Sequence, residues 1–416
     1  MDDWRRYKSL RNRTTARIKE ERKTWEKEKL NSVKNNPTSL WKNVKTWLNW
    51  NNTGPPSQLF HQGQLINSPA GLAGTMNNFF ISKVRNLRQG IPPTELDPLH
   101  VLREAFSDRE CSFRFTAVHP EEVHRVLRGL KNTKSCGVDY IDTAIVKLVA
   151  EDILAPLTHV INLSIQSSTF PSMWKQAKVI PLLKKGDPHI PKTYRPVALL
   201  PILSKVLERV VYNQLVKYLD TEQIIHQNHH GSRQGHSTAT ALIQLYDRWV
   251  DDIDSGNMVG VMMVDLSAAF DMVDHPILLE KLRIFGLEES ALQWMSSYLV
   301  GRSQSTYVDG CFSPALDIEC GVPQGSILGP LLYILFTNDV PSLVQDQTSS
   351  FKDQVAFSDD SGGMVCYVDD GTYTVSHSDP NILLNVLTAK YLAIADDMVS
   401  NLHRLQFMYE FGSLNS

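Results

Sequence analysis

Asp369-Asp370 is the acidic pair of this sequence that could do chemistry. It lies between the apolar run Met364–Val368 and a second β-prone run, Thr372–Val375. Three other adjacent Asp pairs stand in polar or helical contexts typical of solvated surface, at positions 251–252, 359–360 and 396–397. Because Asp370-Gly371 is itself a hairpin-turn signal, a plain β-turn is the simplest interpretation of this pair taken alone.

A third carboxylate changes that interpretation. Asp265 ends the apolar run GVMMVD, residues 260–265, and a charge at the end of a buried strand costs desolvation energy unless it is paired or bound to a cation. If this run pairs beside the 364–375 hairpin, Asp265, Asp369 and Asp370 converge. Three clustered carboxylates favour Mg²⁺, and two such ions support phosphoryl transfer.

A tight turn poor in side chains follows in GVPQGSILGPLL, residues 321–332. Gln324 and Gly325 stand in this turn, and Ser326 can cap the apolar helix expected after it. A glycine-rich helix entry lets a nucleotide approach the backbone closely. A simple loop-to-helix junction is the alternative for this stretch alone.

Short strands among helices must position these residues. Met258–Val264 and the two runs around Asp369-Asp370 have strand character, while the Lys-, Arg- and Glu-rich residues 3–50 indicate a helix interrupted at Pro37. A further helix is expected from Pro120, since two Glu follow it in the first turn.

The stretches between the basic N-terminal region and that helix carry mixed signals. Residues 51–70 are rich in Asn, Gly, Pro and Ser and predict a loop. Residues 71–90 are compatible with a helix, and residues 91–100, with three prolines, predict a linker. Beyond residue 113 helices are expected to dominate.

The composition is that of a globular protein of two or three domains: 416 residues, 42% hydrophobic and 21% charged. No run of about 18 apolar residues predicts a membrane-spanning helix. The charged N-terminus lacks an apolar signal core, so secretion is not expected. Five scattered cysteines without a CxxC pair indicate reduced thiols in an intracellular protein, nuclear and/or cytoplasmic, without a zinc site.

The net charge of −3 conceals a gradient along the chain. The first fifty residues hold 14 Lys and Arg against 6 Asp and Glu, an excess of eight positive charges, which leaves −11 for the remainder. A basic arm on an acidic body suits contact with a polyanion. A solvated helix that binds nothing is the alternative interpretation.

The ordered set DLSAAFD (265–271), GVPQGSILGPLL (321–332) and YVDD (367–370) resembles a reverse transcriptase. Residues 181–211 and 229–242 are similar to the finger motifs of non-LTR (LINE-type) retrotransposon polymerases. The resemblance extends over about residues 113–405. It implies an α+β fold, the fingers and palm of a right-hand polymerase, with a small antiparallel sheet backed by helices.

The resemblance also implies a division of the chain. Residues 1–50 would form a basic helical arm, a helical N-terminal extension, and residues 51–112 a linker region with short helices. Residues 113–175 would be the N-terminal extension of the polymerase, and residues 176–416 its fingers and palm. The family's next segment, its primer grip and its thumb have no counterpart in the sequence, so a C-terminally truncated polymerase without a thumb is expected.

Metal ligands follow from the resemblance residue by residue. Asp265, Asp369 and Asp370 would be the catalytic metal-binding triad, with the carbonyl of Leu266 as a further ligand. The implied cofactor is Mg²⁺, two ions, with Mn²⁺ as the alternative. The implied partners are an RNA template, a DNA primer and dNTPs; no membrane is implied, and the oligomeric state stays open.

The implied nucleotide-binding residues are Lys184, Arg195, Phe270, Gln324 and Gly325. Phe270 would be the steric gate that excludes a ribonucleotide 2′-hydroxyl, and Arg195 would contact the triphosphate. Arg233 matches a finger position expected to meet the template backbone. For Lys184 and Arg233 a plain surface cation is the alternative.

Three functions remain open on the sequence alone. RNA-directed DNA polymerisation is the leading hypothesis. A decayed, truncated polymerase that only binds nucleic acid is the second, motivated by the missing thumb segment. An RNA-dependent RNA polymerase or another two-metal nucleotidyltransferase is the third, and Phe270 argues against its use of ribonucleotides. Two departures from the family's pattern are Val368 before the Asp pair and Ser232 at a position that is usually aromatic.

Overall fold

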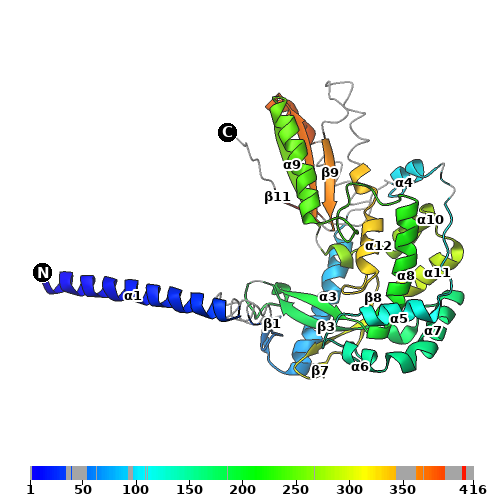
Figure 1. Cartoon of the computed structure of the whole chain (residues 1–416), viewed down its shortest axis with the longest axis horizontal. Helices are drawn as coiled ribbons and strands as arrows, with labels where there is room; N and C mark the ends of the chain where they lie inside the picture. The colour runs from blue at the N-terminus through cyan, green and yellow to red at the C-terminus, as the bar shows by residue number, and fades with distance from the viewer. Residues whose placement is uncertain are drawn as a thin grey trace. The chain divides into compact units, whose positions relative to one another are not determined.

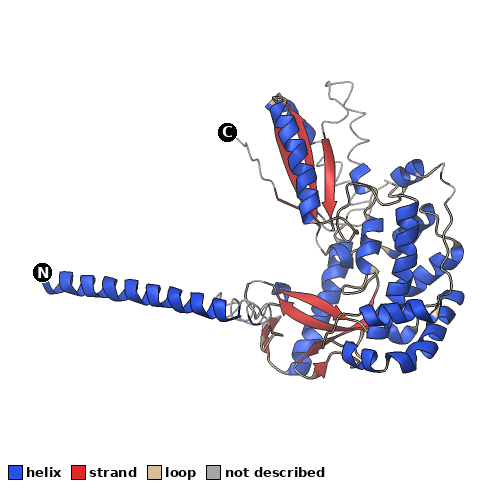
Figure 2. Ribbon diagram, in the orientation of Figure 1, coloured by secondary structure: helices blue, strands red, loops and turns tan. Residues whose placement is uncertain are grey.

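The computed structural model describes residues 2–33, 39, 54–61, 63–91, 97–107, 109, 111–184, 186–266, 268–342, 362–368, 370–388 and 405–408. The chain divides into two compact units, Met1–Gly54 and Pro55–Ser416. In the parts of the chain covered by these ranges, no helix is long and apolar enough to cross a membrane. Figures 1 and 2 show the elements.

One long helix, α1 (Asp2–Val33), makes up most of what is described of the first unit. Its described side chains are exposed to solvent, and Arg17 and Glu21 approach to 3.7 Å one turn apart. The sequence predicted this helix from its Lys, Arg and Glu content. The predicted interruption at Pro37 lies outside the described residues.

The second unit mixes helices and strands. The helices are α3 (Pro69–Gln89), α4 (His100–Ala105), α5 (Pro120–Gly129), α6 (Thr143–Leu148), α7 (Ala150–Gln166), α8 (Ile202–Thr221), α9 (Thr238–Asp254), α10 (His275–Ile284), α11 (Glu289–Leu299) and α12 (Gly329–Phe336). The strands are β1 (Leu59–His61), β2 (Gln64–Ile66), β3 (Gln176–Leu183), β4 (Tyr194–Leu199), β5 (Met258–Leu266), β6 (Arg302–Val308), β7 (Cys311–Phe312), β8 (Leu316–Ile318), β9 (Gly362–Tyr367), β10 (Asp370–His377) and β11 (Leu405–Met408).

A four-stranded sheet contains the strands predicted from the acidic stretches. Its order is β11-β5-β10-β9, and every pairing is antiparallel. The helix α9 lies along this sheet (Figure 1). The expected small antiparallel sheet backed by helices is therefore confirmed, and β5 pairs beside the hairpin as predicted.

A second, five-stranded sheet was not predicted. It runs β4-β3-β6-β7, with β8 also paired to β6, and β3 is parallel to β6 but antiparallel to β4. The helix α3 covers one of its faces, where Met76 and Phe80 pack with Val179 and Tyr194 in a buried cluster. The α3 helix itself agrees with the helix predicted over residues 71–90.

The loop predicted over residues 51–70 was wrong for part of its length. Residues 59–61 of β1 pair with residues 64–66 of β2 in a small antiparallel sheet, and Leu59 is completely buried. Turn-forming residues dominate the composition of this stretch, but a short apolar strand can still pair when a neighbouring cluster buries it. Here the cluster is the one around α3.

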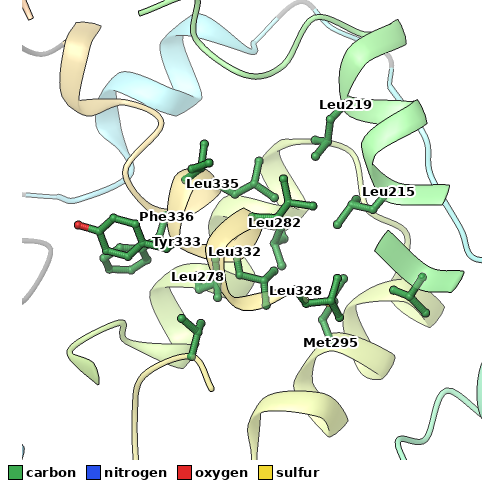
Figure 3. Close-up of a cluster of buried hydrophobic side chains, with 14 of the residues drawn as sticks. Leu215, Leu219, Leu278, Leu282, Met295, Leu328, Leu332, Tyr333, Leu335 and Phe336 are labelled. Atoms are coloured by element: carbon green, nitrogen blue, oxygen red, sulfur yellow. The ribbon is translucent and has the colours of Figure 1, made fainter. Parts of the chain in front are cut away.

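The main core lies among α8, α10, α11 and α12. Figure 3 shows Leu215 and Leu219 of α8, Leu278 and Leu282 of α10 and Met295 of α11 around the residues of α12. The helix α12 is buried on nearly all sides, which explains its almost purely apolar sequence. This core holds the N-terminal end of α12, and thus the turn before it, in a fixed position.

One ion pair is buried in this core. The Lys281 ammonium on α10 lies 2.8 Å from the Asp339 carboxylate and also donates to the carbonyl of Phe336, at 2.7 Å. A buried charge needs such partners because desolvation is otherwise too costly. The pair therefore links α10 to the C-terminal end of α12.

Candidate active site

Asp265 and Asp370 lie directly opposite each other on two neighbouring strands of the four-stranded sheet. Asp265 lies one residue before the end of β5, Asp370 is the first residue of β10, and the two are direct cross-strand partners. Both side chains are exposed. Cross-strand partners project from the same face with Cβ atoms about 4.5–5.5 Å apart, so the two carboxylates approach each other as the sequence predicted. Asp369 lies outside the described residues.

The hairpin turn is tighter than the sequence signal suggested. Tyr367 of β9 pairs with Asp370 of β10, so only two residues separate the two strands. The prediction of a turn at Asp370-Gly371 was wrong. Gly371 lies within β10, where it pairs with Cys366 of β9 and with Val264 of β5. Val368 instead has a left-handed backbone, with φ of 58°, which is unfavourable for a β-branched residue. Contacts from elsewhere must hold this turn.

The loop over residues 226–231 supplies those contacts. The His230 N–H donates to the Cys366 carbonyl, and the Cys366 N–H donates to the Asn228 carbonyl, both at 2.9 Å. A Cβ atom on Gly231 would lie 2.5 Å from the backbone nitrogen of Val368. Only glycine allows the loop to pack this closely against the turn. This loop therefore covers the β9 edge and supports the acidic turn.

Arg233 stabilises the same loop. Its Nη1 atom donates to the carbonyls of His226 and His229, at 3.3 and 3.4 Å, and the side chain is half-buried. These two bonds occupy part of the guanidinium with backbone acceptors of its own loop. Contact between Arg233 and a template stays a prediction.

Burial lowers the pKa of two histidines of this loop. His229 is buried, its ring nitrogen Nε2 lies 3.0 Å from the Thr337 carbonyl, and desolvation lowers its pKa to about 4. Desolvation also lowers the pKa of His230, whose ring lies between the Thr240 hydroxyl and the Gln244 amide oxygen.

Phe270 and the turn before α12 are bonded together. Phe270 belongs to the 3₁₀ turn η3 (Ala269–Asp271), and its ring stacks on Tyr333 of α12 with centroids 4.8 Å apart. The Val322 N–H donates to the Phe270 carbonyl at 2.8 Å, and the Gly321 N–H donates to the Val273 carbonyl at 2.7 Å. The structure therefore brings Phe270 and the Gln324–Gly325 turn into one assembly.

Gln324 has a fixed orientation in this assembly. Its amide Nε2 donates to Asp271 Oδ1 at 2.7 Å. Burial raises the pKa of the Asp271 carboxyl, although the bond from Gln324 opposes that shift. Asp271 was not among the predicted site residues, although it stands in the same DLSAAFD run as Asp265 and Phe270.

Gly325 connects the turn to the five-stranded sheet. Its φ is 80°, and a Cβ atom there would lie 2.7 Å from the Ala198 carbonyl of β4. Both the conformation and the close approach require glycine. The predicted N-cap at Ser326 was wrong, because Leu328 holds that position in α12; the Ser326 side chain nevertheless accepts from the Gly329 N–H at 2.8 Å.

Glu208 on α8 stabilises the end of the Gln324–Gly325 turn, where α12 begins. It is completely buried on α8, and its Oε2 accepts from the N–H groups of Ile327, at 2.7 Å, and Leu328, at 3.4 Å. Ser204 Oγ donates to Oε1 at 2.9 Å. A buried carboxylate bonded to backbone N–H groups at a helix entry is a strong anchor. Sequence reasoning missed Glu208, because its role comes from contacts with Ile327 and Leu328, which lie far away in the chain.

Arg195 lies on β4 of the five-stranded sheet and Lys184 directly follows β3, so neither belongs to the sheet that carries the carboxylate pair. The Lys184 N–H donates to the Thr193 carbonyl at 2.9 Å, and Arg195 is the cross-strand partner of Leu182. Because side chains alternate along a strand, Lys184 and Arg195 project from the same face. Both are exposed, and α3 covers the opposite face.

The carboxylate pair is compatible with a divalent cation. Like charges directly opposite each other on a sheet repel, and hard oxygen donors suit Mg²⁺. Leu266 has its side chain in the core, so it would contribute only its carbonyl. Over the described ranges no group of three or more His, Cys, Asp or Glu side chains gathers, and the predicted third carboxylate, Asp369, lies outside them.

Comparison with curated proteins gives relatives of one kind. The chain is 34% identical over 223 residues to the RNA-directed DNA polymerase from mobile element jockey of Drosophila funebris, 53% of this chain and 24% of that protein. It is 33% identical over 233 residues to the probable RNA-directed DNA polymerase from transposon X-element of Drosophila melanogaster, 54% of this chain and 25% of that protein. The matches thus span about a quarter of the relatives' length.

A family match covers the part of the chain that contains the candidate site residues of the four-stranded and the five-stranded sheet. Residues 182–400 match the family described as reverse transcriptase (RNA-dependent DNA polymerase). The matched stretch begins at the end of β3 and includes Asp265, Phe270, Gln324 and Asp370. Since it exceeds half of the chain, this protein belongs to the reverse transcriptase family, and within it resembles the LINE-type polymerases of non-LTR retrotransposons.

Proposed function

We propose that this chain is an RNA-directed DNA polymerase that adds dNTPs to the 3′-hydroxyl of a DNA primer on an RNA template. The observation that carries the proposal is the register of Asp265 against Asp370 at the turn of the four-stranded sheet. Family membership over residues 182–400 supports the same reading.

Asp265, Asp369 and Asp370 would hold two Mg²⁺ ions, or Mn²⁺, together with the Leu266 carbonyl. When bound, these ions would lower the pKa of the attacking hydroxyl and neutralise charge on the leaving pyrophosphate. The protein's own contribution is to keep the carboxylates together against their repulsion. The Gly231 contact with Val368 and the backbone bonds to Cys366 perform that task.

The nucleotide would lie between the two sheets' functional residues. Lys184 and Arg195 would bind its phosphates, since their exposed side chains share one face of the β3–β4 pair. Phe270 would exclude the 2′-hydroxyl; its stacking on Tyr333 supports a fixed ring position. Gln324 and Gly325 would line the pocket, and Arg233 would meet the template backbone.

In this proposal the four-stranded sheet is the palm and the β3–β4 pair belongs to the fingers, within residues 176–416. Residues 113–175 would be the polymerase's N-terminal extension, and α1 a basic helical arm. Residues 51–112 would connect the two. We assign no thumb to the described residues, and a non-catalytic nucleic-acid binder is the alternative function that the experiment below addresses.

Primer extension tests the proposal. Purified full-length chain would be incubated with an annealed RNA template and DNA primer, Mg²⁺ and dNTPs. We expect extension that requires the metal and falls at least a hundredfold in Asp265→Asn and in Asp370→Asn. The matched control is Asp251→Asn/Asp252→Asn, an acidic pair on α9 that should leave extension unchanged. Folded protein without extension, or extension insensitive to both site variants, would overturn polymerase activity.

A further inference from the structure

A small pocket lies between α3 and the face of the five-stranded sheet that this helix covers. It encloses about 90 Å³ and is called the α3 pocket below. Since a cavity of roughly 150 Å³ holds a benzene ring, a molecule bound here would have a body of only a few carbon atoms. The α3 pocket is therefore too small for a nucleotide.

The α3 pocket also lies on the opposite face of the sheet from Lys184 and Arg195. The cross-strand partners Val179 of β3 and Ala198 of β4 line it. Val179 stands five residues before Lys184, and the separation between Arg195 and Ala198 is three residues. An odd separation along a strand places two side chains on opposite faces. The pocket is therefore separate from the face proposed to bind nucleotide phosphates.

Two cations stand side by side at one end of the α3 pocket. Lys175 directly precedes β3, Arg302 begins β6, and both side chains line the pocket. The two strands run parallel with Gln176 opposite Ser303, and the Ser303 N–H donates to the Lys175 carbonyl at 3.4 Å. Desolvation and the neighbouring Arg302 charge lower the pKa of the Lys175 ammonium. An anion beside them would relieve that repulsion.

The Arg302 guanidinium is buried, and one of its N–H groups lacks an acceptor. Only 2% of the residue is exposed. Its Nε donates to the Tyr298 carbonyl at 2.7 Å, whereas Nη2 has no hydrogen-bond partner among the described residues. Within the same residues, neither Arg302 nor Lys175 has a carboxylate within ion-pair distance. A buried charge without a counter-ion is costly, so an anion would be stabilised here.

Arg88 of α3 contributes a second N–H group of this kind. Its Nη2 donates to Asp274 Oδ2 at 2.9 Å, but its Nη1 is buried without a partner in the described parts of the chain. Desolvation lowers the pKa of His275, and the charges of Arg88 and Arg302 add to that shift, so both guanidiniums lie close to one imidazole. Two such donors lining one pocket match the two oxygens of a carboxylate.

The remaining lining of the α3 pocket is largely apolar. The helix contributes three of these side chains and the sheet and the turn before α12 contribute the others: Phe80, Ile81, Val84, Ala177, Ile318 and Val322. Apolar surface beside a pair of cations favours a molecule with a hydrocarbon body and a single negative group.

The acidic residues of the lining do not compensate the Arg302 charge. Glu319 pairs with Arg85 at 2.9 Å, where both side chains are exposed. Asp271 accepts from the Gln324 amide at 2.7 Å, and Asp317 is an exposed residue of β8. The positive end of the pocket therefore keeps its need for an anion.

We propose that the α3 pocket binds a short-chain carboxylate, with its oxygens toward Arg302, Arg88 and Lys175 and its hydrocarbon body among the apolar side chains. A guanidinium fork matches a planar carboxylate in geometry. An inorganic anion would use the same cations but would leave the apolar lining uncovered. This binding requires neither template nor nucleotide, so it stands or falls independently of the proposed polymerase activity.

The test uses full-length chain with ¹³C-labelled isoleucine methyl groups, titrated with sodium butyrate and observed by NMR. Butyramide is the neutral probe of the same shape, and sulfate is the anion without a hydrocarbon body. Arg302→Gln removes the buried charge, and Val84→Phe fills the apolar part from α3. Their matched controls are Arg125→Gln on α5 and Ser82→Phe on α3, at exposed positions outside the pocket. Thermal unfolding checks that each variant is folded.

We expect butyrate to bind with a dissociation constant of about 1 mM, as is reasonable for six non-hydrogen atoms. The methyl signals of Ile81 and Ile318 should shift, and that of Ile161 in the main core should not. Butyramide should bind at least tenfold more weakly, since a hydrogen bond to a charged group contributes roughly tenfold or more. Arg302→Gln and Val84→Phe should each weaken butyrate binding at least tenfold, and the controls should bind as the unmodified chain does.

Four outcomes would overturn the proposal. Butyrate could cause no saturable shift at Ile81 or Ile318, which would mean that the pocket holds water only. Butyramide could bind as tightly as butyrate, so that the cations recognise nothing. Sulfate could displace butyrate at equal concentration, which would reassign the pocket to inorganic anions. Folded Val84→Phe could keep the full affinity for butyrate, and this variant decides the matter if Arg302→Gln does not fold.

Discussion

At Gly231, the absence of a side chain decides the position of the acidic turn. A Cβ atom there would lie 2.5 Å from both the backbone nitrogen and a side-chain methyl of Val368. We predict that Gly231→Ala displaces the turn and lowers the primer-extension rate constant by one to two orders of magnitude, because a shift of about 1 Å at reacting groups costs roughly a hundredfold. Single-turnover extension measures the effect.

The control for that substitution is Gly74→Ala in α3. Nothing lies within 4 Å of a Cβ atom at Gly74, and the residue is helical, so alanine should preserve activity and slightly raise stability. Extension by Gly231→Ala at the unmodified rate would show that the turn does not depend on this contact.

Phe270 carries a second prediction at this scale. If its ring, stacked on Tyr333, excludes the 2′-hydroxyl, then Phe270→Val should raise the use of NTPs relative to dNTPs by at least tenfold. The ratio of kcat/KM for UTP and dTTP measures it. Phe312→Val, on β7 of the five-stranded sheet, is the comparison variant and should leave the ratio unchanged. An unchanged ratio in Phe270→Val would remove the steric-gate role.

The sequence could predict the site residues that stand at the ends of apolar strands. Asp265 and Asp370 are adjacent to apolar runs, so their unusual position is visible locally. Gly231 and Glu208 are not visible in this way, because their roles come from contacts with Val368 and Ile327, far away in the chain. Such tertiary contacts have no local signature.

Among the elements, α8 has a role beyond packing, because its Glu208 holds the entry to α12. We predict that Glu208→Leu raises the KM for dNTPs about tenfold, since the N–H of Ile327 loses its acceptor and the Gln324–Gly325 turn loosens. Glu208→Gln should keep the KM for dNTPs close to that of the unmodified chain, because an amide oxygen can accept from the same N–H. Steady-state kinetics with each variant measures this.

Loss of stability alone must be separated from that effect. Leu127→Ala on α5 removes a fully buried side chain of the same core and should cost about 2–5 kcal/mol without changing the KM. If Glu208→Leu and Leu127→Ala unfold at similar temperatures and have equal KM values, Glu208 is structural only.

The five-stranded sheet shows why elements can escape prediction. Its strands β3 and β4 contain Pro181 and Pro196, which are cross-strand partners, and β6 is the polar run RSQSTYV. Proline inside an apolar run argues against a strand, and a polar run lacks the alternation of a half-buried one. The four-stranded sheet has apolar, β-branched strands and was predicted for that reason.

For the whole molecule, buried histidines predict a loss of stability in acid. His229 has a pKa of about 4 in the fold, against about 6.5 when unfolded, so the unfolded state binds the proton more readily between these values. The contribution of neutral His229 to the free energy of unfolding is therefore complete above pH 6.5, and it declines as the pH falls toward 4. The contribution of His229 is a loss of about 2 kcal/mol at pH 5.

Urea unfolding between pH 7.5 and 5 measures this dependence. His229→Gln should flatten it, whereas His159→Gln, an exposed residue of α7, should not. His226, His230 and His275 also have pKa values lowered by desolvation and should leave a residual slope in the His229 variant. A slope unaffected by His229→Gln would assign the acid sensitivity to the other groups.

The bonds between residues 228–230 and Cys366 also bear on the order of folding. The loop is synthesised long before β9, yet its backbone partners lie on that strand. Contacts between distant segments form late, because a large loop must close first. During synthesis the early helices and the five-stranded sheet can therefore assemble while the loop has no partner. The acidic turn and the loop that supports it would become ordered together, in the last cooperative step.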